Sequence, residues 1–278
     1  MTRDPLRIAL SIGLYIFFYV AAAMVIAPVL LGLGGRLVAV SVSGFIAAAG
    51  TNALALKIYE GLSLPAIGLA WNRTSARNLG LGLAGGVGSA LTVICIPLLA
   101  GLARLRTDPA AETNWGTFAF VGLMLLAGSA GEEILFRGYG FQLLLRSLGP
   151  SATILPVGVL FAALHAANPN STYLGLANTA GFGILFGYAF LRSGDLWFPI
   201  GLHFGWNLVL PIMGVSVSGF TMKVTSLVVD WNVGALWSGG DYGPEGGVFA
   251  SVALGLLLLY LWKVPVRRQK PWYLPPSD

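Results

Sequence analysis

Eight long apolar runs dominate this chain and restrict it to folds that place helices in a lipid bilayer. Each run is close to the ~17–25 residues that a membrane-crossing helix needs, and they cover 8–31, 37–56, 79–103, 117–136, 151–167, 174–191, 196–215 and 247–262. Only 10% of the 278 residues are charged, against roughly 25% in a soluble domain, and the mean hydropathy is +0.79. The sequence therefore predicts an all-α fold, a polytopic membrane helix bundle of about eight transmembrane helices.

The distribution of lysine and arginine predicts how this bundle faces. With the N-terminus inside, twelve of the sixteen basic residues fall in inner segments and four in outer ones, so both termini are expected in the cytoplasm. Topology explains the net charge of +5 better than a nucleic-acid partner does. The first run is longer than a signal-peptide core and is interpreted as an uncleaved anchor. We expect a multi-pass protein whose partner is the lipid bilayer, in a bacterial cell membrane since the chain is compact; its oligomeric state has no sequence signal.

No internal repeat, linker or shift in composition divides the chain, so one membrane domain is expected. Within it, residues 1–116 hold the first three helices, and residues 117–212 form a core with most of the polar residues at membrane depth. Residues 213–278 hold an outer loop, the last transmembrane helix and a basic tail. The single cysteine, Cys95, excludes a disulfide scaffold and a cysteine-rich zinc site.

Three polar clusters interrupt the apolar runs of the core. An ionisable group at membrane depth costs several kcal/mol unless it is paired or faces a wet cavity, so such groups are functional candidates. Both histidines of the chain belong to these clusters. The clusters read GEEILFRG at 131–138, FAALH at 161–165 and HFGWN at 203–207.

Helical geometry separates the roles of these residues. Glu133 and Arg137 are four apart on one helix face and are expected to form a salt bridge, whereas Glu132 is rotated by about 100° and stays free. His203 and Asn207 also share one face. The structural alternatives are that the two acids mark a helix end, that His165 is a hydrogen-bonded core residue, and that the third cluster joins two helices.

Taken together, these clusters resemble the EExxxR, FxxxH and HxxxN motifs of the CPBP family of intramembrane proteases. This family includes the CAAX prenyl protease 2 (Rce1-like) and bacteriocin-processing (Abi) proteins. All three motifs occur in the family's order within about a third of the chain. The resemblance implies hydrolysis of a peptide bond in a membrane-embedded or lipidated peptide substrate.

The resemblance also implies roles for the motif residues. Glu132 is expected to act as general base on a water molecule, aided by His165, and His203 and Asn207 are expected to stabilise the oxyanion. The remaining motif residues are expected to support the site, and they are Glu133, Arg137 and Phe161. No cofactor is expected, because an amide is a poor zinc ligand; the alternative is a zinc ion held by Glu132, His165 and His203.

If the helices are straight, Glu132 and His165 are expected at different depths in the membrane. Counted from their starts, Glu132 lies about 22 Å along a helix that enters from outside and His165 about 21 Å along one that enters from the cytoplasm. We expect either that the helix of Glu132 continues to Arg146 and tilts, or that the boundaries differ.

Other functions leave different patterns in a sequence. The GxSG, GxGD and HExxH motifs of other intramembrane proteases are absent, and a transporter is expected to show inverted repeats. The remaining alternative is a catalytically idle membrane scaffold or bacteriocin-immunity protein with the same fold.

Overall fold

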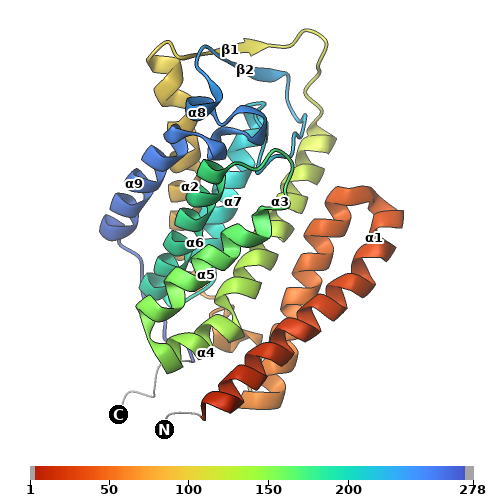
Figure 1. Ribbon diagram of the computed structural model, residues 1–278, viewed down its shortest axis with the longest axis vertical. Helices are drawn as coiled ribbons and strands as arrows, with labels where there is room; N and C mark the ends of the chain where they lie inside the picture. The colour runs from red at the N-terminus through yellow and green to blue at the C-terminus, as the bar shows by residue number, and fades with distance from the viewer. Residues whose placement is uncertain (1–3, 273–278) are drawn as a thin grey trace.

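The computed structural model describes residues 4–272 and confirms the all-α membrane bundle (Figure 1). The main helices are α1 (Pro5–Ala55), α2 (Arg73–Leu99), α3 (Trp115–Arg137), α4 (Tyr139–Leu148), α5 (Pro150–His165), α6 (Tyr173–Ser193), α7 (Trp197–Ile212), α8 (Ala235–Ser238) and α9 (Val248–Lys263). Short helical turns cover Leu56–Glu60, Leu64–Ile67, Gly240–Tyr242 and Pro244–Gly246. Two strands, β1 (Ala103–Thr107) and β2 (Leu227–Trp231), pair antiparallel at one end of the bundle.

Every predicted apolar run coincides with a helix, and the first two runs are the two arms of α1. The arms reverse direction at Gly35, whose φ of 75° is a left-handed conformation that glycine adopts without strain. Four helical stretches are long and apolar enough to cross a membrane in the described part of the chain: Pro5–Glu60, Arg73–Leu99, Trp115–Leu148 and Tyr173–Ser193. The chain is an integral membrane protein.

Closely packed glycines hold α7 against α2. A Cβ atom at Gly82 or Gly86 would clash with backbone atoms of α7, and one at Gly201 would clash with the backbone of α2. Small residues let helix backbones approach one another in membranes, where van der Waals contact drives helix association. This packing positions α7, which carries the HFGWN cluster, in the centre of the bundle.

Of the two alternatives expected for the helix of Glu132, the structure shows different boundaries: the helix does not continue unbroken to Arg146, because the chain breaks at Gly138. The side chain of Asn52 is wholly buried at the break, where it donates to Ile134 O at 3.1 Å and accepts from Tyr139 N at 2.7 Å. A Cβ at Gly138 would clash with this amide. After the break α4 turns across the end of the bundle, and α5 returns obliquely (Figure 1).

Both described ends of the chain lie at the same end of the bundle. The start of α1 is there (Figure 1), and Trp272 stacks on Tyr139 of α4 with ring centroids 5.8 Å apart. The opposite end carries β1, β2 and α8. This arrangement agrees with an even number of crossings; the cytoplasmic location of the termini stays a prediction.

Candidate active site

The three polar clusters meet at one cavity of about 720 Å³. Glu132 comes from α3, His165 is the last residue of α5, and His203 and Asn207 lie one turn apart on α7. All four line the cavity, together with side chains from α1, α6 and the segment between α7 and α9. The residues singled out from the sequence as catalytic are therefore neighbours in space, although 75 positions separate the first from the last.

The predicted salt bridge between Glu133 and Arg137 is present and fully buried. Arg137 Nη1 donates to Glu133 Oε1 at 3.1 Å, and Arg137 Nη2 donates to the carbonyl oxygen of Gly183 on α6 at 2.6 Å. The guanidinium also lies 5.2 Å from the ring centroid of Phe161 and 5.5 Å from that of Phe186. Because Arg137 neutralises Glu133, this buried pair is tolerated and ties α3 to α6.

Glu133 makes a second contact, which sequence reasoning did not find. Its Oε1 accepts a hydrogen bond from His203 Nδ1 at 3.0 Å. A carboxylate only accepts, so Nδ1 carries the proton, and Nε2 is the free nitrogen of the neutral ring. Glu133 thus does more than hold its helix in place: it sets the orientation and the tautomer of His203.

His165 is oriented in the same way by a backbone carbonyl. Its Nδ1 donates to Phe161 O at 2.8 Å, so Nε2 is again the free nitrogen. The ring of Phe161 packs against that of His165, with centroids 4.6 Å apart. The four-residue spacing of the FxxxH motif is what brings the carbonyl and the ring together on one turn of α5.

Both free imidazole nitrogens point at the same carboxylate oxygen. Glu132 Oε2 lies 3.9 Å from His203 Nε2 and 4.0 Å from His165 Nε2, and it has no direct hydrogen bond among the described residues. About 40% of the Glu132 side chain is exposed, and it lines the cavity. A separation near 4 Å is too long for a direct hydrogen bond and matches the span that one water molecule bridges at ordinary distances of ~2.8 Å.

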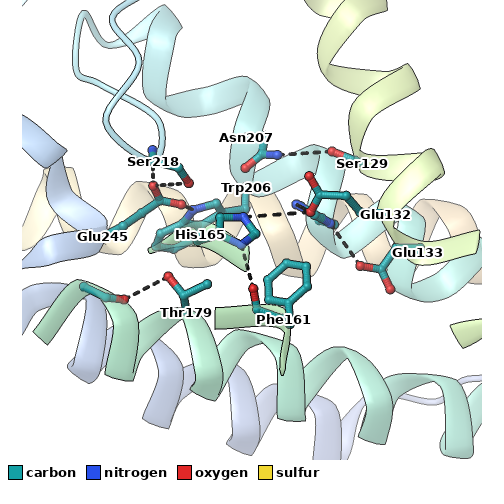
Figure 2. A network of polar contacts seen from close by, with 12 residues as sticks. Ser129, Glu132, Glu133, Phe161, His165, Thr179, Trp206, Asn207, Ser218 and Glu245 are labelled. Carbon is teal, nitrogen blue, oxygen red and sulfur yellow. Dashed lines mark hydrogen bonds and ion pairs between the residues drawn. The ribbon is translucent and has the colours of Figure 1, made fainter. Parts of the chain in front are cut away.

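Asn207 completes the cavity wall one turn beyond His203. Its Nδ2 donates to Ser129 Oγ at 3.2 Å (Figure 2). An amide nitrogen carries two protons, so one N–H stays available to a ligand in the cavity. Ser129 lies one turn before Glu133 on α3, and this serine was not singled out from the sequence.

The oblique course of α5 removes the expected difference in depth. The expected difference in depth between Glu132 and His165 came from treating the helices as straight and parallel. In the structure α5 crosses the bundle at a slant, and its C-terminal end approaches α3 (Figure 1). Glu132 lies five residues before the end of α3, about 8 Å along the axis, and still faces His165. The break at Gly138 permits this, since it separates the direction of α3 from that of α4 and α5.

Glu245 is a further residue of the cavity, and it lies in the segment that was predicted as an outer loop. It is buried, and its oxygens accept from Trp206 Nε1 at 2.9 Å, from Ser218 Oγ at 2.9 Å and from Ser218 N (Figure 2). The carboxylate therefore ties the segment that follows α7 to α7 itself. No local pattern distinguishes Glu245 from a solvated loop acid, because its three donors come from distant positions.

Comparison with known proteins agrees with the motif analysis. The protein-family model described as type II CAAX prenyl endopeptidase, Rce1-like, matches residues 114–209. Searches of the curated proteins and of the solved structures found no match. The matched segment contains α3 to α7 without the last three residues of α7, and with them every residue of the three motifs. The match supports a CAAX-type intramembrane protease in general, and over residues 114–209 the chain is similar to the Rce1-like family.

Proposed function

We propose that this protein is an intramembrane endopeptidase that uses Glu132 to activate water for hydrolysis of a peptide bond. The observation that carries the proposal is the convergence of two oriented imidazole nitrogens on Glu132 Oε2, at 3.9 and 4.0 Å, beside a cavity of about 720 Å³. A carboxylate whose Oε2 is buried beside two imidazole nitrogens and has no direct hydrogen bond is suited to act as a general base on a water molecule. The neighbouring acid, Glu133, is engaged by Arg137 and His203, so Glu132 is the carboxylate available to a substrate.

The proposed reaction assigns one task to each group. Glu132 accepts a proton from water bound between it and His165 while the water oxygen forms a bond to the scissile carbonyl carbon. Asn207 Nδ2 donates to the developing oxyanion, and His203 assists when its Nε2 also carries a proton. Collapse of the intermediate breaks the carbon–nitrogen bond, and Glu132 returns the proton to the leaving amine.

The same three side chains are the ones that would hold a metal ion. A carboxylate and two histidines suit zinc, which would activate the water as a Lewis acid. The atoms that bind a tetrahedral zinc ion lie about 3.4 Å from one another. Glu132 Oε2 lies farther than this from both imidazole nitrogens, at 3.9 Å from His203 Nε2 and 4.0 Å from His165 Nε2. No group of three potential ligands close enough to hold a metal occurs in residues 4–272. These separations favour a water molecule over zinc, and we propose a metal-independent reaction.

The substrate is proposed as a membrane-embedded or lipidated peptide or protein tail, in agreement with the CAAX-type family. The cavity walls are largely apolar and lie within a bundle of membrane helices, which suits a substrate that approaches through the bilayer. Both termini are proposed to be cytoplasmic, in a bacterial cell membrane. An idle scaffold or immunity protein would not need two imidazoles oriented on one free carboxylate.

Replacement of the Glu132 carboxylate by an amide tests the proposal. The full chain is reconstituted in vesicles with a reporter peptide, and the rate of cleavage is compared for the native protein, Glu132→Gln and the control Glu112→Gln, which alters an exposed loop acid. We expect Glu132→Gln to lose at least ~100-fold in kcat, the control to keep full activity, and a chelator such as EDTA to have no effect. Equal cleavage rates for Glu132→Gln and Glu112→Gln would refute the protease assignment. Loss of activity in EDTA would show that the reaction depends on a metal ion.

A further inference from the structure

A tight turn at residues 217–220 forms one wall of the cavity. Val217 and Phe220 close it with two backbone hydrogen bonds of 2.9 and 2.8 Å, and Val217, Ser218 and Phe220 line the cavity. Both central residues have positive φ, 48° at Ser218 and 87° at Gly219, which is the pattern of a type I′ turn. A serine rarely adopts this conformation, and it persists only where the surrounding structure holds it.

Contacts on two sides hold this turn in place. Glu245 Oε2 accepts hydrogen bonds from the backbone N–H and from the hydroxyl of Ser218. Gly219 N donates to Tyr242 O at 2.8 Å. On the other side the turn packs so closely that a Cβ at Gly219 would lie 2.0 Å from Pro169 O. The turn is therefore wedged between the segment that follows α5 and the segment that precedes α9.

The partners of Glu245 explain why this position needs a carboxylate. Its Oε1 accepts from Trp206 Nε1 at 2.9 Å, and its Oε2 accepts from the Ser218 hydroxyl at 2.9 Å and from Ser218 N. The indole N–H and the backbone N–H can only donate. A carboxylate offers an oxygen to each of them, whereas the NH2 group of a glutamine would face one of the two.

The same carboxylate also fixes a side chain of α7. Trp206 lies between His203 and Asn207 in the chain and lines the cavity. Its ring packs on that of Phe182, with centroids 4.4 Å apart. Within residues 4–272 no hydrogen bond joins Glu245 to any of the four residues assigned to the chemistry. Glu245 therefore acts on the reaction only through the two parts of the cavity wall that it holds.

We propose that Glu245 is a positioning residue of the protease, which holds the turn at residues 217–220 and the indole of Trp206 as the wall against which the substrate chain binds. The proposal rests on the proposed protease function and deepens it by assigning part of the substrate-binding surface. Glu245 lies outside the segment that matches the family model. Since Ser218 and Glu245 lie on the side of the site away from Glu132 (Figure 2), loss of this wall weakens substrate binding and leaves the chemical step unchanged.

Binding to a hydrolysis-deficient protein tests this role without depending on turnover. In a Glu132→Gln background and uncharged detergent, fluorescence anisotropy measures the Kd of a labelled reporter peptide, and the melting temperature is measured on the same samples. Glu245→Gln is expected to raise Kd about tenfold. Glu245→Asp is expected to raise it less, because both oxygens remain. The control Asp241→Asn changes an exposed acid of the same segment and is expected to leave Kd unchanged.

A pair of glycine variants keeps the test decisive if Glu245→Gln does not fold. Gly219→Ala pushes the same turn away from Pro169 without altering Glu245, and it is expected to raise Kd at least as much. Gly234→Ala, whose Cβ would meet nothing within 4 Å, is the matched control and is expected to bind like the native chain.

Steady-state kinetics of the active protein separate a role in binding from a role in folding. Glu245→Gln is expected to raise KM about tenfold and to keep kcat within about threefold of the native value. An unchanged Kd in Glu245→Gln and Gly219→Ala overturns the proposal, as does a lower kcat with an unchanged KM. A rise in Kd no larger than the loss of folded protein accounts for also overturns it, because Glu245 then only stabilises the fold. If the native protein cleaves no peptide while the differences in Kd remain, the protease function is rejected and the binding wall stands.

Discussion

Glu133 offers the sharpest test of the geometry, because one buried oxygen serves two partners. Its Oε1 accepts from Arg137 at 3.1 Å and from His203 at 3.0 Å, and its side chain is fully buried. Glu133→Gln keeps the shape of the side chain and removes the charge. Arg137 then stays buried without a counter-charge, which costs about 3–5 kcal/mol of stability. Arg137→Gln likewise leaves Glu133 buried without a counter-charge and is expected to cost a similar amount of stability.

The double variant Glu133→Gln with Arg137→Gln separates the pair from its surroundings. It leaves no buried charge unpaired, so its loss of stability is expected to fall about 2–3 kcal/mol short of the sum of the two single losses. The free energy of unfolding is measured by denaturant titration in mixed micelles for all four proteins. Strictly additive losses would contradict the buried ion pair and, with it, the structural role of the EExxxR spacing.

Catalysis distinguishes the two single variants, which stability does not. Arg137→Gln keeps the carboxylate that orients His203, whereas Glu133→Gln replaces it with an amide that can present either a donor or an acceptor to Nδ1. Assayed below the melting temperature of both, Glu133→Gln is expected to have the lower kcat. If Arg137→Gln is the more damaged of the two at equal folded fraction, Glu133 does not act by positioning His203.

Two further predictions follow from single contacts. Asn207→Ala removes a proposed oxyanion donor and is expected to lower kcat by about 10²–10³-fold with little change in KM; a loss confined to KM in steady-state assays would argue for a binding role. Gly86→Ala places a methyl group against the backbone of Leu202, where α2 and α7 touch, and is expected to lower the melting temperature. Gly88→Ala, whose Cβ would meet nothing within 4 Å, is the matched control and is expected to melt near the native value.

Much of the fold could be predicted because few backbone structures are stable in a lipid bilayer. Backbone polar groups must be satisfied inside each crossing segment, so long apolar runs become helices, and all eight runs do so. The break at Gly138 could not be predicted. It depends on Asn52, which is 86 positions away and fills the gap between the two helices. The burial of Glu245 was missed for the same reason, since Trp206 and Ser218 reach it from distant positions.

The sequence by itself determined that this is a helical membrane protein, that three motifs hold the ionisable residues singled out at membrane depth, and that Glu133 pairs with Arg137. These conclusions rest on composition and on the period of a single helix, which are local properties. Only the tertiary structure decided that His165 and His203 aim their free nitrogens at Glu132, that Glu133 orients His203, and that Glu245 anchors a turn in the wall of their cavity. The physical reason is that side-chain direction across a bundle depends on the tilt and contact of neighbouring helices, which no single segment encodes.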